Sequence, residues 1–439
     1  MIAPARLAAF EVLRVVGSGR SDLGSALARA RTRLTDERDR ALASEIATGT
    51  LRWQGAFDHI IVAFANRPLR QLDPEVLDIL RLTIFQLVHL DRIPASAAVK
   101  DAVDLAGKAG KRSASGLVNA VLRRVSRERE RLPLPGPPQD PADREAAIAY
   151  LSTTLSHPPW LVERWLDRYG FENTQAWARF NNAPAPLTLR VNRLKVAPAE
   201  LIAALASHGV EVEPARHAVD ALVVRSGNPL ATPPDAQGLF VLQDEASQLV
   251  GAFAGARPGE RVLDACASPG GKTTAMASAM GDRGLLVAAD VRGRRLDLLV
   301  RAVRRSGASS VRVVQADVTA PLPFGPVFDR VLLDAPCSGL GTLRRDPDIK
   351  WRRSAADLPA LALTQAAMLE RTSTALAPSG TLVYSTCSSE PEENDGVIEA
   401  FLRAHPEFHM AREPLRTLPH RDGLEAFFAA MLVRTKDLR

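Results

Sequence analysis

Cysteine is scarce in this 439-residue chain, which contains Cys266, Cys337 and Cys387 and no other. Three thiols make no disulfide framework in a protein of this length, and none lies in a CxxC pair of the kind that binds zinc. We therefore predict free thiols, a cytoplasmic compartment and no bound metal.

Long apolar runs are also absent. A membrane-spanning helix needs about 18 to 20 consecutive apolar residues, and no stretch of the chain approaches that length. Arg6, Glu11 and Arg14 interrupt the apolar N-terminal residues, which is typical of an amphipathic helix and not of a signal peptide. With 46% apolar and 24% charged residues, the composition is that of a folded protein of two or three domains with no membrane partner.

The excess of positive charge is small over the whole chain but concentrated in one segment. The net charge is +6, and residues 108–131 contain eight Lys or Arg against two Glu. Apolar residues at helical spacing between 117 and 125 predict a buried stripe, which leaves the basic residues together outside. This face is either a solvated helix surface or a surface that contacts nucleic-acid phosphates.

The first part of the chain has the pattern of a helical domain. Residues 1–131 show helical periodicity almost throughout, and 76–90 is apolar nearly all round, which predicts the centre of a bundle. Asp73-Pro74 is a typical helix start. Residues 132–141 contain five prolines, so we predict an interdomain linker there.

A small α+β module is predicted over residues 142–245, as a connecting or RNA-binding part. Strand-like alternation occurs at 187–192, 221–226 and 239–243, and a helix is predicted over 200–209. Prolines and glycines separate these segments, as expected for short elements joined by turns.

From about residue 246, apolar strand candidates alternate with helical segments. This alternation predicts βαβ units and an open, mostly parallel sheet. Four strand candidates end at or just before Asp264, Asp290, Asp317 and Asp334, and a fifth ends at Cys387. Since ligands bind at the carboxyl ends of strands in such sheets, we expect the chemistry at these residues.

The segment 264–273, DACASPGGKT, follows a strand candidate and begins a helix. Its Pro269-Gly270-Gly271 removes side chains where the backbone must turn tightly and approach a ligand. Asp290 lies 19 residues after Gly271, close to the roughly 20 at which an acid reaches ribose hydroxyls. A cofactor that contains a nucleoside is favoured over a plain glycine-rich turn.

Two other nucleotide-binding motifs fit this segment poorly. A phosphate-binding P-loop needs glycine where Cys266 stands, five residues before the Gly-Lys pair. A dinucleotide fingerprint needs glycines where Ala267 and Ser268 stand. Both interpretations are therefore weak.

Two cysteines lie at strand ends, in DAPCSG (334–339) and YSTCSS (384–389). A single cysteine is commonly a buried, inert residue. Two thiols in equivalent places, Cys337 and Cys387, can instead converge on one substrate. Cys266 is closer to the glycine turn and is expected to serve packing or cofactor contact.

These motifs, in this order and spacing, resemble the RNA cytosine-5 methyltransferase family, with Ser268 where many members carry alanine. Further blocks resemble the same family: LQDEASQLV (242–250), LRRDPDIKW (343–351) and DGLEAFFAAMLVR (422–434). Residues from about 36 to 125 resemble a NusB-type RNA-binding domain. That fusion is the arrangement of the ribosomal small subunit methyltransferase B branch, and the resemblance covers nearly the whole chain.

The resemblance implies a Rossmann-like class I methyltransferase domain of the α/β class over 246–439, preceded by an all-α NusB-like domain over 1–131 and the module over 142–245. It implies S-adenosylmethionine as cofactor and methylation of carbon 5 of a cytosine through a covalent cysteine–base intermediate. The branch favours small-subunit (16S) ribosomal RNA as substrate, with transfer RNA as the alternative. We expect a monomer.

The family also implies roles for single residues. Cys387 corresponds to the nucleophile, Cys337 to the thiol that assists removal of the carbon 5 proton, and Asp334 to the residue that binds ring nitrogen 3. The implied cofactor residues are Cys266, Ala267, Ser268, Pro269, Gly270, Gly271 and Lys272 around the methionine part, Asp290 at the ribose, Asp317 at the adenine, and Asp334.

Four charged residues outside these motifs have weaker interpretations. Arg344 and Arg345 are expected either to meet RNA phosphates or to be solvated. Glu392 and Glu393 have the pattern of acids at a helix N-terminus, where the helix dipole favours negative charge.

Two rival functions remain. A DNA cytosine-5 methyltransferase would use the cysteine of the Pro-Cys motif as nucleophile and carry a large recognition region late in the chain, and no such insertion exists here. An RNA-binding scaffold with an inactive methyltransferase domain is the second rival. Intact Cys337, Cys387 and Asp334 argue against it.

Overall fold

The computed structural model describes residues 2–435, and the contacts between residues divide the chain into two units. The first, here the helical unit, comprises Met1–Pro184 and Leu343–Ala355. The second, the α/β unit, comprises Ala185–Thr342 and Ala356–Arg439. None of the helices within residues 2–435 is long and apolar enough to cross a membrane.

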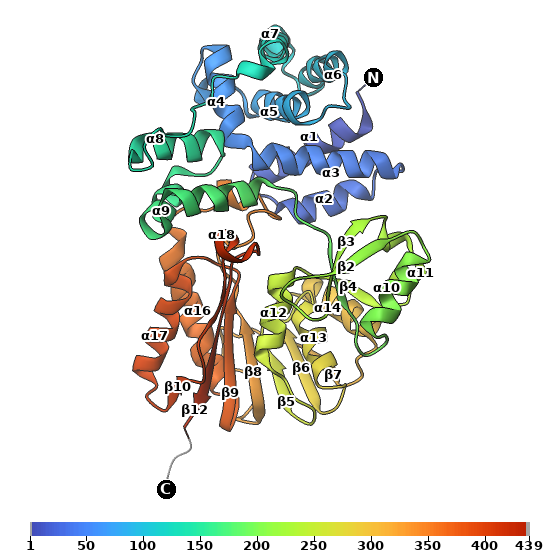
Figure 1. Cartoon of the computed structure of the whole chain (residues 1–439), viewed down its shortest axis with the longest axis vertical. Helices are drawn as coiled ribbons and strands as arrows, with labels where there is room; N and C mark the ends of the chain where they lie inside the picture. The colour runs from blue at the N-terminus through green and yellow to red at the C-terminus, as the bar shows by residue number, and fades with distance from the viewer. Residues whose placement is uncertain (1, 436–439) are drawn as a thin grey trace. The chain divides into compact units, whose positions relative to one another are not determined.

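The helical unit is built around α5, the element whose sequence is apolar nearly all round (Figure 1). Its helices are α1 (Pro4–Gly17), α2 (Leu23–Arg31), α3 (Glu37–Arg52), α4 (Gln54–Ala65), α5 (Pro74–His89), α6 (Ala95–Lys108), α7 (Ser115–Arg127), α8 (Arg144–Ala149), α9 (Pro159–Asn182) and α15 (Ile349–Arg352). The predicted start of α5 at Asp73-Pro74 is confirmed, and ten of its sixteen residues are buried.

The predicted apolar stripe of the basic segment is also confirmed. Val118, Val121, Leu122 and Val125 of α7 are buried, so its basic residues lie on the other side of the helix. A hollow of about 600 Å³ lies between α6 and α7, and its lining includes the exposed side chains of Lys100, Arg123 and Arg127.

The contact division does not follow the predicted module. Residues 132–141 contain no helix or strand, as expected for a linker. The segment that follows contributes α8 and α9 to the helical unit, and the unit boundary falls after Pro184, inside the range 142–245. The division into three domains therefore stays a prediction.

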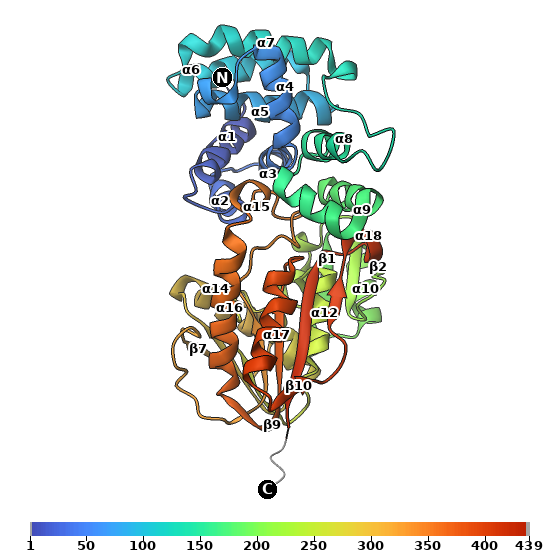
Figure 2. The same ribbon diagram turned by 90° about the vertical axis from the view of Figure 1, so that its left-hand side faces the viewer.

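A segment from far along the chain completes the helical unit. Residues 343–355 leave the α/β unit, form the short helix α15, and return. In Figure 2, α15 (orange) lies beside α2 (blue). The Trp351 indole N–H donates to the Leu51 carbonyl at 2.6 Å, and its ring packs against the core of this unit.

Lys350 anchors the same segment. Its side chain is buried, and Nζ donates to the carbonyl oxygens of Arg52 (3.2 Å) and Ser156 (3.1 Å) and to Oδ1 of Asn182 (2.9 Å). Burial, together with the charge of Arg52, lowers the pKa of Lys350 well below its ordinary range. The segment is therefore held by polar contacts to three separate parts of the helical unit.

Arg344 has partners within the helical unit. Its guanidinium donates to the carbonyls of Ala183 (3.2 Å from Nε) and Pro184, and lies 4.4 Å from the centre of the Phe180 ring. The side chain remains half-buried, so its expected contact with RNA phosphates stays a prediction.

The α/β unit contains a small antiparallel sheet in the order β2-β3-β1-β4. Its elements are β1 (Thr188–Val191), α10 (Pro198–Ala206), β2 (Glu211–Pro214), β3 (Ala221–Ser226), α11 (Pro233–Ala236) and β4 (Phe240–Leu242). The strands predicted at 187–192, 221–226 and 239–243 are confirmed. We did not predict β2, whose mostly exposed residues EVEP lack the alternation of a half-buried strand.

The large sheet has the order β10-β12-β9-β8-β5-β6-β7, with β11 paired to β12. Its strands are β5 (Arg261–Asp264), β6 (Leu285–Asp290), β7 (Val311–Gln315), β8 (Phe328–Asp334), β9 (Leu376–Thr386), β10 (Phe408–Met410), β11 (Leu415–Thr417) and β12 (Phe427–Arg434). Strands β5 to β9 are parallel, and the last three pair antiparallel. The predicted fold class and the five parallel strands are confirmed.

Helices cover both faces of this sheet (Figure 1). Side chains of α16 (Asp357–Ser373) and α17 (Asp395–Ala404) fill the core on one face. Those of α12 (Glu245–Ala254), α13 (Gly271–Ala279) and α14 (Gly293–Ser306) fill it on the other. The chain runs outward from β5 through β6 and β7, then returns to β8 on the other side of β5. A crevice for a ligand is expected where this order reverses.

Candidate active site

The parallel register brings the predicted acids to one edge of the sheet. Asp264, Asp290 and Asp334 are the last residues of β5, β6 and β8, and Cys387 directly follows β9. Asp317 lies two residues beyond β7. The ends of β5 and β8 flank the point where the strand order reverses, so Asp264 and Asp334 lie at its centre.

Asp264 is a buried acid for which our sequence analysis predicted no part of the cofactor or substrate as a partner. Its Oδ2 accepts a hydrogen bond from the Thr273 hydroxyl at 2.6 Å, whereas Oδ1 is buried with no partner. Burial raises the pKa of Asp264 to about 7. Because buried polar atoms are nearly always hydrogen-bonded, this oxygen fits a donor supplied by a ligand.

The glycine turn is tied to the predicted ribose acid. Gly270 has φ +105°, and a Cβ there would lie 3.0 Å from Ala302 and 3.1 Å from Leu299, so glycine is required by both conformation and space. The Ser268 N–H donates to Oδ2 of Asp290 at 3.2 Å. The turn and the acid thus form one side of the edge where a nucleoside would lie.

Two other predicted cofactor residues differ in environment. Asp317 is exposed and accepts hydrogen bonds from the hydroxyl and N–H of Thr319, which lower its pKa. Burial raises the pKa of the Cys266 thiol, whose side chain packs against the core of the sheet. Cys266 therefore packs beside the turn with its thiol form favoured, and its contact with the cofactor stays a prediction.

Lys272 and Asp334 form an ion pair. Lys272 Nζ lies 2.6 Å from Oδ2 of Asp334, and the Ser385 hydroxyl donates to the other carboxylate oxygen at 2.7 Å. Burial alone would lower the pKa of Lys272, but the negative charges of Asp334 and Cys387 raise it overall. A protonated lysine thus lies beside the predicted base-binding acid.

The two strand-end thiols lie together. Sγ of Cys337 is 3.1 Å from Sγ of Cys387, although 50 residues separate them in the chain. The hydrogen bond to Cys387, and then burial, raise the pKa of Cys337. The two thiols that were expected to converge are therefore adjacent in the structure.

As expected, Glu392 and Glu393 are acids in the first turn of a short helix, the 3-10 helix Pro391–Glu393 directly before α17, but Glu393 also has partners far along the chain. It is fully buried in the turn before α17, and its carboxylate accepts hydrogen bonds from the Ser338 N–H (2.7 Å) and the Gln365 amide (2.9 Å). These donors belong to the first thiol loop and to α16. In the sequence, a serine follows each of the two strand-end cysteines, Cys337 and Cys387. Our sequence analysis did not use this signal for the site.

Comparisons with known proteins match three family models to this chain. Residues 254–433 match the 16S rRNA methyltransferase RsmB/F model, residues 3–127 match the NusB family, and residues 157–231 match the RsmF/B-like ferredoxin-like domain. The chain is 37% identical over 441 residues to ribosomal RNA small subunit methyltransferase B of Pseudomonas putida, covering 98% of each chain. It belongs to the 16S rRNA methyltransferase RsmB/F family.

Two further proteins extend this comparison. The probable ribosomal RNA small subunit methyltransferase B of Bacillus subtilis is 36% identical over 410 residues, which cover 89% of this chain and 90% of that protein. The crystal structure of PH0851 superposes with a TM-score of 0.81 at 26% identity, covering 98% of this chain and 99% of that one. The resemblance noted from the motifs is therefore confirmed over nearly the whole chain.

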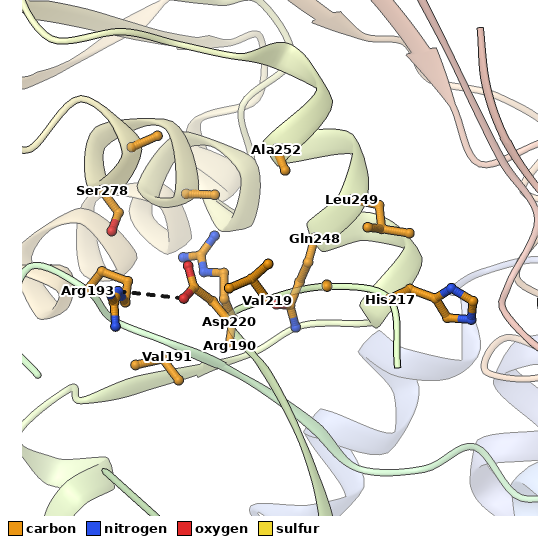
Figure 3. Close-up of a pocket in the computed structure, with 14 residues that line it drawn as sticks. Arg190, Val191, Arg193, His217, Val219, Asp220, Gln248, Leu249, Ala252 and Ser278 are labelled. Atoms are coloured by element: carbon orange, nitrogen blue, oxygen red, sulfur yellow. Dashed lines mark ion pairs between the residues drawn. The ribbon is translucent and has the colours of Figure 1, made fainter. Parts of the chain in front are cut away.

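A separate pocket of about 350 Å³ lies in the α/β unit of this rRNA methyltransferase, between β1, α12, α13 and the loop before β3 (Figure 3). Arg193 and Asp220 form an ion pair at its wall. Arg190, which also lines it, donates to the Gly271 carbonyl and to the Thr274 hydroxyl, and burial lowers its pKa to about 10. The pocket lining includes no predicted catalytic or cofactor residue.

Within residues 2–435, no group of three or more His, Cys, Asp or Glu side chains could hold a metal ion.

Proposed function

We propose that this protein methylates carbon 5 of a cytosine in 16S ribosomal RNA, with S-adenosylmethionine as methyl donor, through a covalent cysteine–base intermediate. The observation that carries the proposal is the pair of thiols 3.1 Å apart next to the ends of β8 and β9. Membership of the rRNA methyltransferase family supports the substrate class.

Carbon 5 of cytosine is too weak a nucleophile to take a methyl group unaided. We assign Cys387 as the thiolate that adds to carbon 6, which moves an electron pair to carbon 5 and activates it. After methylation, the carbon 5 proton leaves with the assistance of Cys337. The electron pair of that C–H bond forms the C5–C6 double bond again, and the bond from carbon 6 to Cys387 breaks.

Lys272 and Asp334 would bind the cytosine ring and stabilise its charge during this addition. Asp334 is held by Ser385 and Lys272, so it can present a fixed oxygen to the base at nitrogen 3. The ammonium group offsets negative charge, both on the attacking sulfur and on the ring. Charge stabilisation of this kind in a partly buried site contributes strongly to catalysis.

The residues at the strand ends fit the proposed cofactor. Asp290 would accept from the ribose hydroxyls and Asp317 from the adenine amine. The unpaired Oδ1 of Asp264 suits the ammonium of the methionine part, and the turn at Gly270 leaves space for the backbone to approach. When bound, S-adenosylmethionine supplies an electrophilic methyl group on a sulfonium.

A trapping experiment tests the covalent mechanism. RNA that contains 5-fluorocytosine should form an adduct with the wild-type protein that survives denaturation, and Cys387→Ala should form none. Cys337→Ala should accumulate a methylated adduct even with ordinary cytosine, visible as a shifted band on a denaturing gel. The double variant should lose that band, since Cys387 makes the bond.

Two other results would refute the assignment. If Cys387→Ala traps RNA and Cys337→Ala is inert, the nucleophile is the cysteine of the Pro-Cys motif. If both single variants remain fully active, catalysis does not proceed through a covalent bond to either thiol.

The cofactor assignment has its own test in Asp290→Ala. Loss of an acceptor for buried ribose hydroxyls costs on the order of 1–3 kcal/mol, which corresponds to a roughly 5- to 150-fold weaker dissociation constant. Titration calorimetry with S-adenosylmethionine measures this change. Wild-type affinity in the variant would mean that the ribose lies elsewhere.

The RNA substrate can be identified in cells. A strain that lacks this gene should lose 5-methylcytosine from its 16S RNA, as read by bisulfite sequencing. If the modification disappears from transfer RNA instead, the chemistry stands and the substrate is transfer RNA.

A further inference from the structure

Two serine side chains next to the thiols are paired in the same way as the two sulfurs. Ser338 directly follows Cys337, and Ser388 directly follows Cys387. Both serines are buried, and their hydroxyl oxygens are 3.2 Å apart. Each thiol is therefore backed by a serine, and the two serines meet just as the two sulfurs do.

The carboxylate of Glu393 joins these serines. Its Oε2 accepts hydrogen bonds from both hydroxyls, of Ser338 and of Ser388. Its Oε1 accepts from the Ser338 N–H at 2.7 Å and from the Gln365 amide at 2.9 Å. One carboxylate thus receives four donors from both thiol loops and from α16.

The buried charge of Glu393 has no positive partner. No Lys, Arg or His within residues 2–435 forms an ion pair with it, and the side chain is fully buried. A buried carboxylate is costly unless hydrogen bonds replace its water. Charge-assisted hydrogen bonds are roughly twice as strong as neutral ones. The four donors therefore offset the cost of burying the carboxylate, and the carboxylate in turn holds the four donors in place.

Two further hydrogen bonds fix this cluster to the core. The Gln365 amide also donates to the carbonyl of Pro336, the residue before Cys337, at 3.0 Å. The Tyr384 hydroxyl of β9 donates to the main-chain carbonyl of Glu393 at 2.6 Å. The loops that carry the thiols are therefore tied to α16 and β9.

We propose that Glu393 is a positioning residue that holds Cys337 and Cys387 in register, so that the two sulfurs act on adjacent carbons of one cytosine. This rests on the proposed covalent mechanism, in which one thiol attacks carbon 6 and the other serves carbon 5. Glu393 acts through Ser338 and Ser388 and is not itself a catalytic residue, since both its oxygens are occupied by donors. Small errors of placement, near 1 Å, can cost about 10²-fold in rate.

The charge of Glu393 has a second effect. After the hydrogen bond to Cys387 and burial, the negative charge of Glu393 also raises the pKa of Cys337. It therefore disfavours a thiolate on Cys337, in keeping with the assignment of Cys387 as the nucleophile.

Three variants separate position from charge. Glu393→Ala removes the four hydrogen bonds to the carboxylate. Glu393→Gln keeps an oxygen for the Ser338 N–H and Gln365, and its amide group can donate to the two serine hydroxyls, so the geometry is kept and the charge is lost. Glu245→Ala is the matched control, because Glu245 is also a buried carboxylate but bonds to the backbone N–H groups of residues 217 and 218.

The first measurement is the spacing of the sulfurs, read with dibromobimane, a short reagent that joins two nearby thiols. Peptide mass spectrometry follows the Cys337–Cys387 cross-link in the full-length protein without RNA. Wild type, Glu393→Gln and Glu245→Ala should cross-link at similar rates, and Glu393→Ala at least about tenfold more slowly, since the sulfurs lose their common register. A wild-type rate in Glu393→Ala overturns the proposal.

The second measurement is catalytic. With 5-fluorocytosine RNA, Glu393→Ala should form adduct about 10²-fold more slowly, with the KM for RNA and the affinity for S-adenosylmethionine within about twofold of wild type. A loss no larger than in Glu245→Ala would mean that Glu393 serves stability alone. If the wild-type protein forms no adduct, the proposed function fails, while the cross-linking rates still decide whether Glu393 sets the thiol spacing.

The third measurement isolates the charge. In Glu393→Gln, the rate of alkylation of Cys337 should rise at lower pH than in wild type, because the nearby negative charge is gone. Glu245→Ala should keep the wild-type profile. An unshifted profile in Glu393→Gln would overturn the electrostatic part of the proposal, even if Glu393→Ala fails to fold.

Discussion

Lys272 in the α/β unit has a side chain that is only 12% exposed, and Lys350 in the helical unit is fully buried, yet the surroundings of these two lysines are opposite. Lys272 pairs with the carboxylate of Asp334, whose charge raises its pKa. Lys350 donates to three uncharged oxygens, and burial lowers its pKa well below the ordinary range. The first environment keeps a positive charge at the strand ends, and the second uses the amine only to join segments of chain.

This difference shows how to separate a buried lysine that serves chemistry from one that serves structure. A counter-ion keeps the ammonium protonated where charge develops in a reaction. Neutral carbonyl acceptors satisfy the N–H groups without stabilising the charge. Substitutions at the two positions should therefore fail in different assays.

The largest effect is expected for Lys272→Met. Loss of the positive charge beside Asp334 and Cys387 should slow methylation on the order of 10²- to 10³-fold, measured as a single-turnover rate with saturating RNA and cofactor. Lys272→Arg, which keeps the charge, should recover part of the rate. An equal loss in Lys350→Met would remove the distinction between the two lysines.

Lys350→Ala should instead destabilise the helical unit. It leaves one buried and two partly buried oxygens without their donor, and an unpaired buried acceptor costs about 1–3 kcal/mol, so a loss of about 2–3 kcal/mol in the free energy of unfolding is expected. Limited proteolysis should then cut within residues 343–355, a site that is protected in wild type. Affinity for S-adenosylmethionine is the control, because its predicted ligands lie in the other unit. Wild-type resistance to protease would contradict this role.

A third buried charge, Asp264, gives stability a pH dependence. Burial raises the pKa of Asp264 from the ordinary 3.8 to about 7, so the folded state favours the protonated carboxyl. The free energy of unfolding therefore falls as the pH rises from the ordinary pKa towards and through 7. Between about pH 5.5 and about pH 8, the free energy of unfolding of the wild type should fall by about 2 kcal/mol more than that of Asp264→Asn. Denaturant unfolding at both pH values measures the difference, and parallel losses in the two proteins would contradict it.

The smallest change is expected on the exposed face between α6 and α7. Replacing Lys100, Arg123 and Arg127 by Gln should reduce the slope of log RNA affinity against log salt by roughly 2 to 3 if each contacts one phosphate. Contacts of exposed charges are worth about 0–1 kcal/mol each. Equal slopes for variant and wild type would leave this face as solvated surface. Deleting residues 1–131 is a poorer test, since it would remove the core against which the partly buried side chain of Trp351 packs.

Local patterns in the sequence determined most of the α/β unit. Strands β5 to β9 were each recognisable from apolar runs that end in a polar residue. A strand in a parallel sheet is buried on both faces, so its sequence is apolar whichever strands lie beside it. The same strand ends identified Asp290, Asp334 and Cys387, since parallel strands deliver their last residues to one edge. Family membership followed from these motifs.

Only the tertiary structure decided the features that depend on partners far along the chain. The run FFAAMLV (427–433) of β12 is apolar throughout, so its periodicity fits a helix or a strand equally, and its pairing with β9 resolves it. Residues 343–355 follow a thiol loop but pack in the helical unit. Glu393 resembled a helix N-terminal acid, yet its donor Ser338 is 55 residues away. Periodicity records which side of an element is buried, whereas the cost of burying a charge is met by groups that only folding brings together.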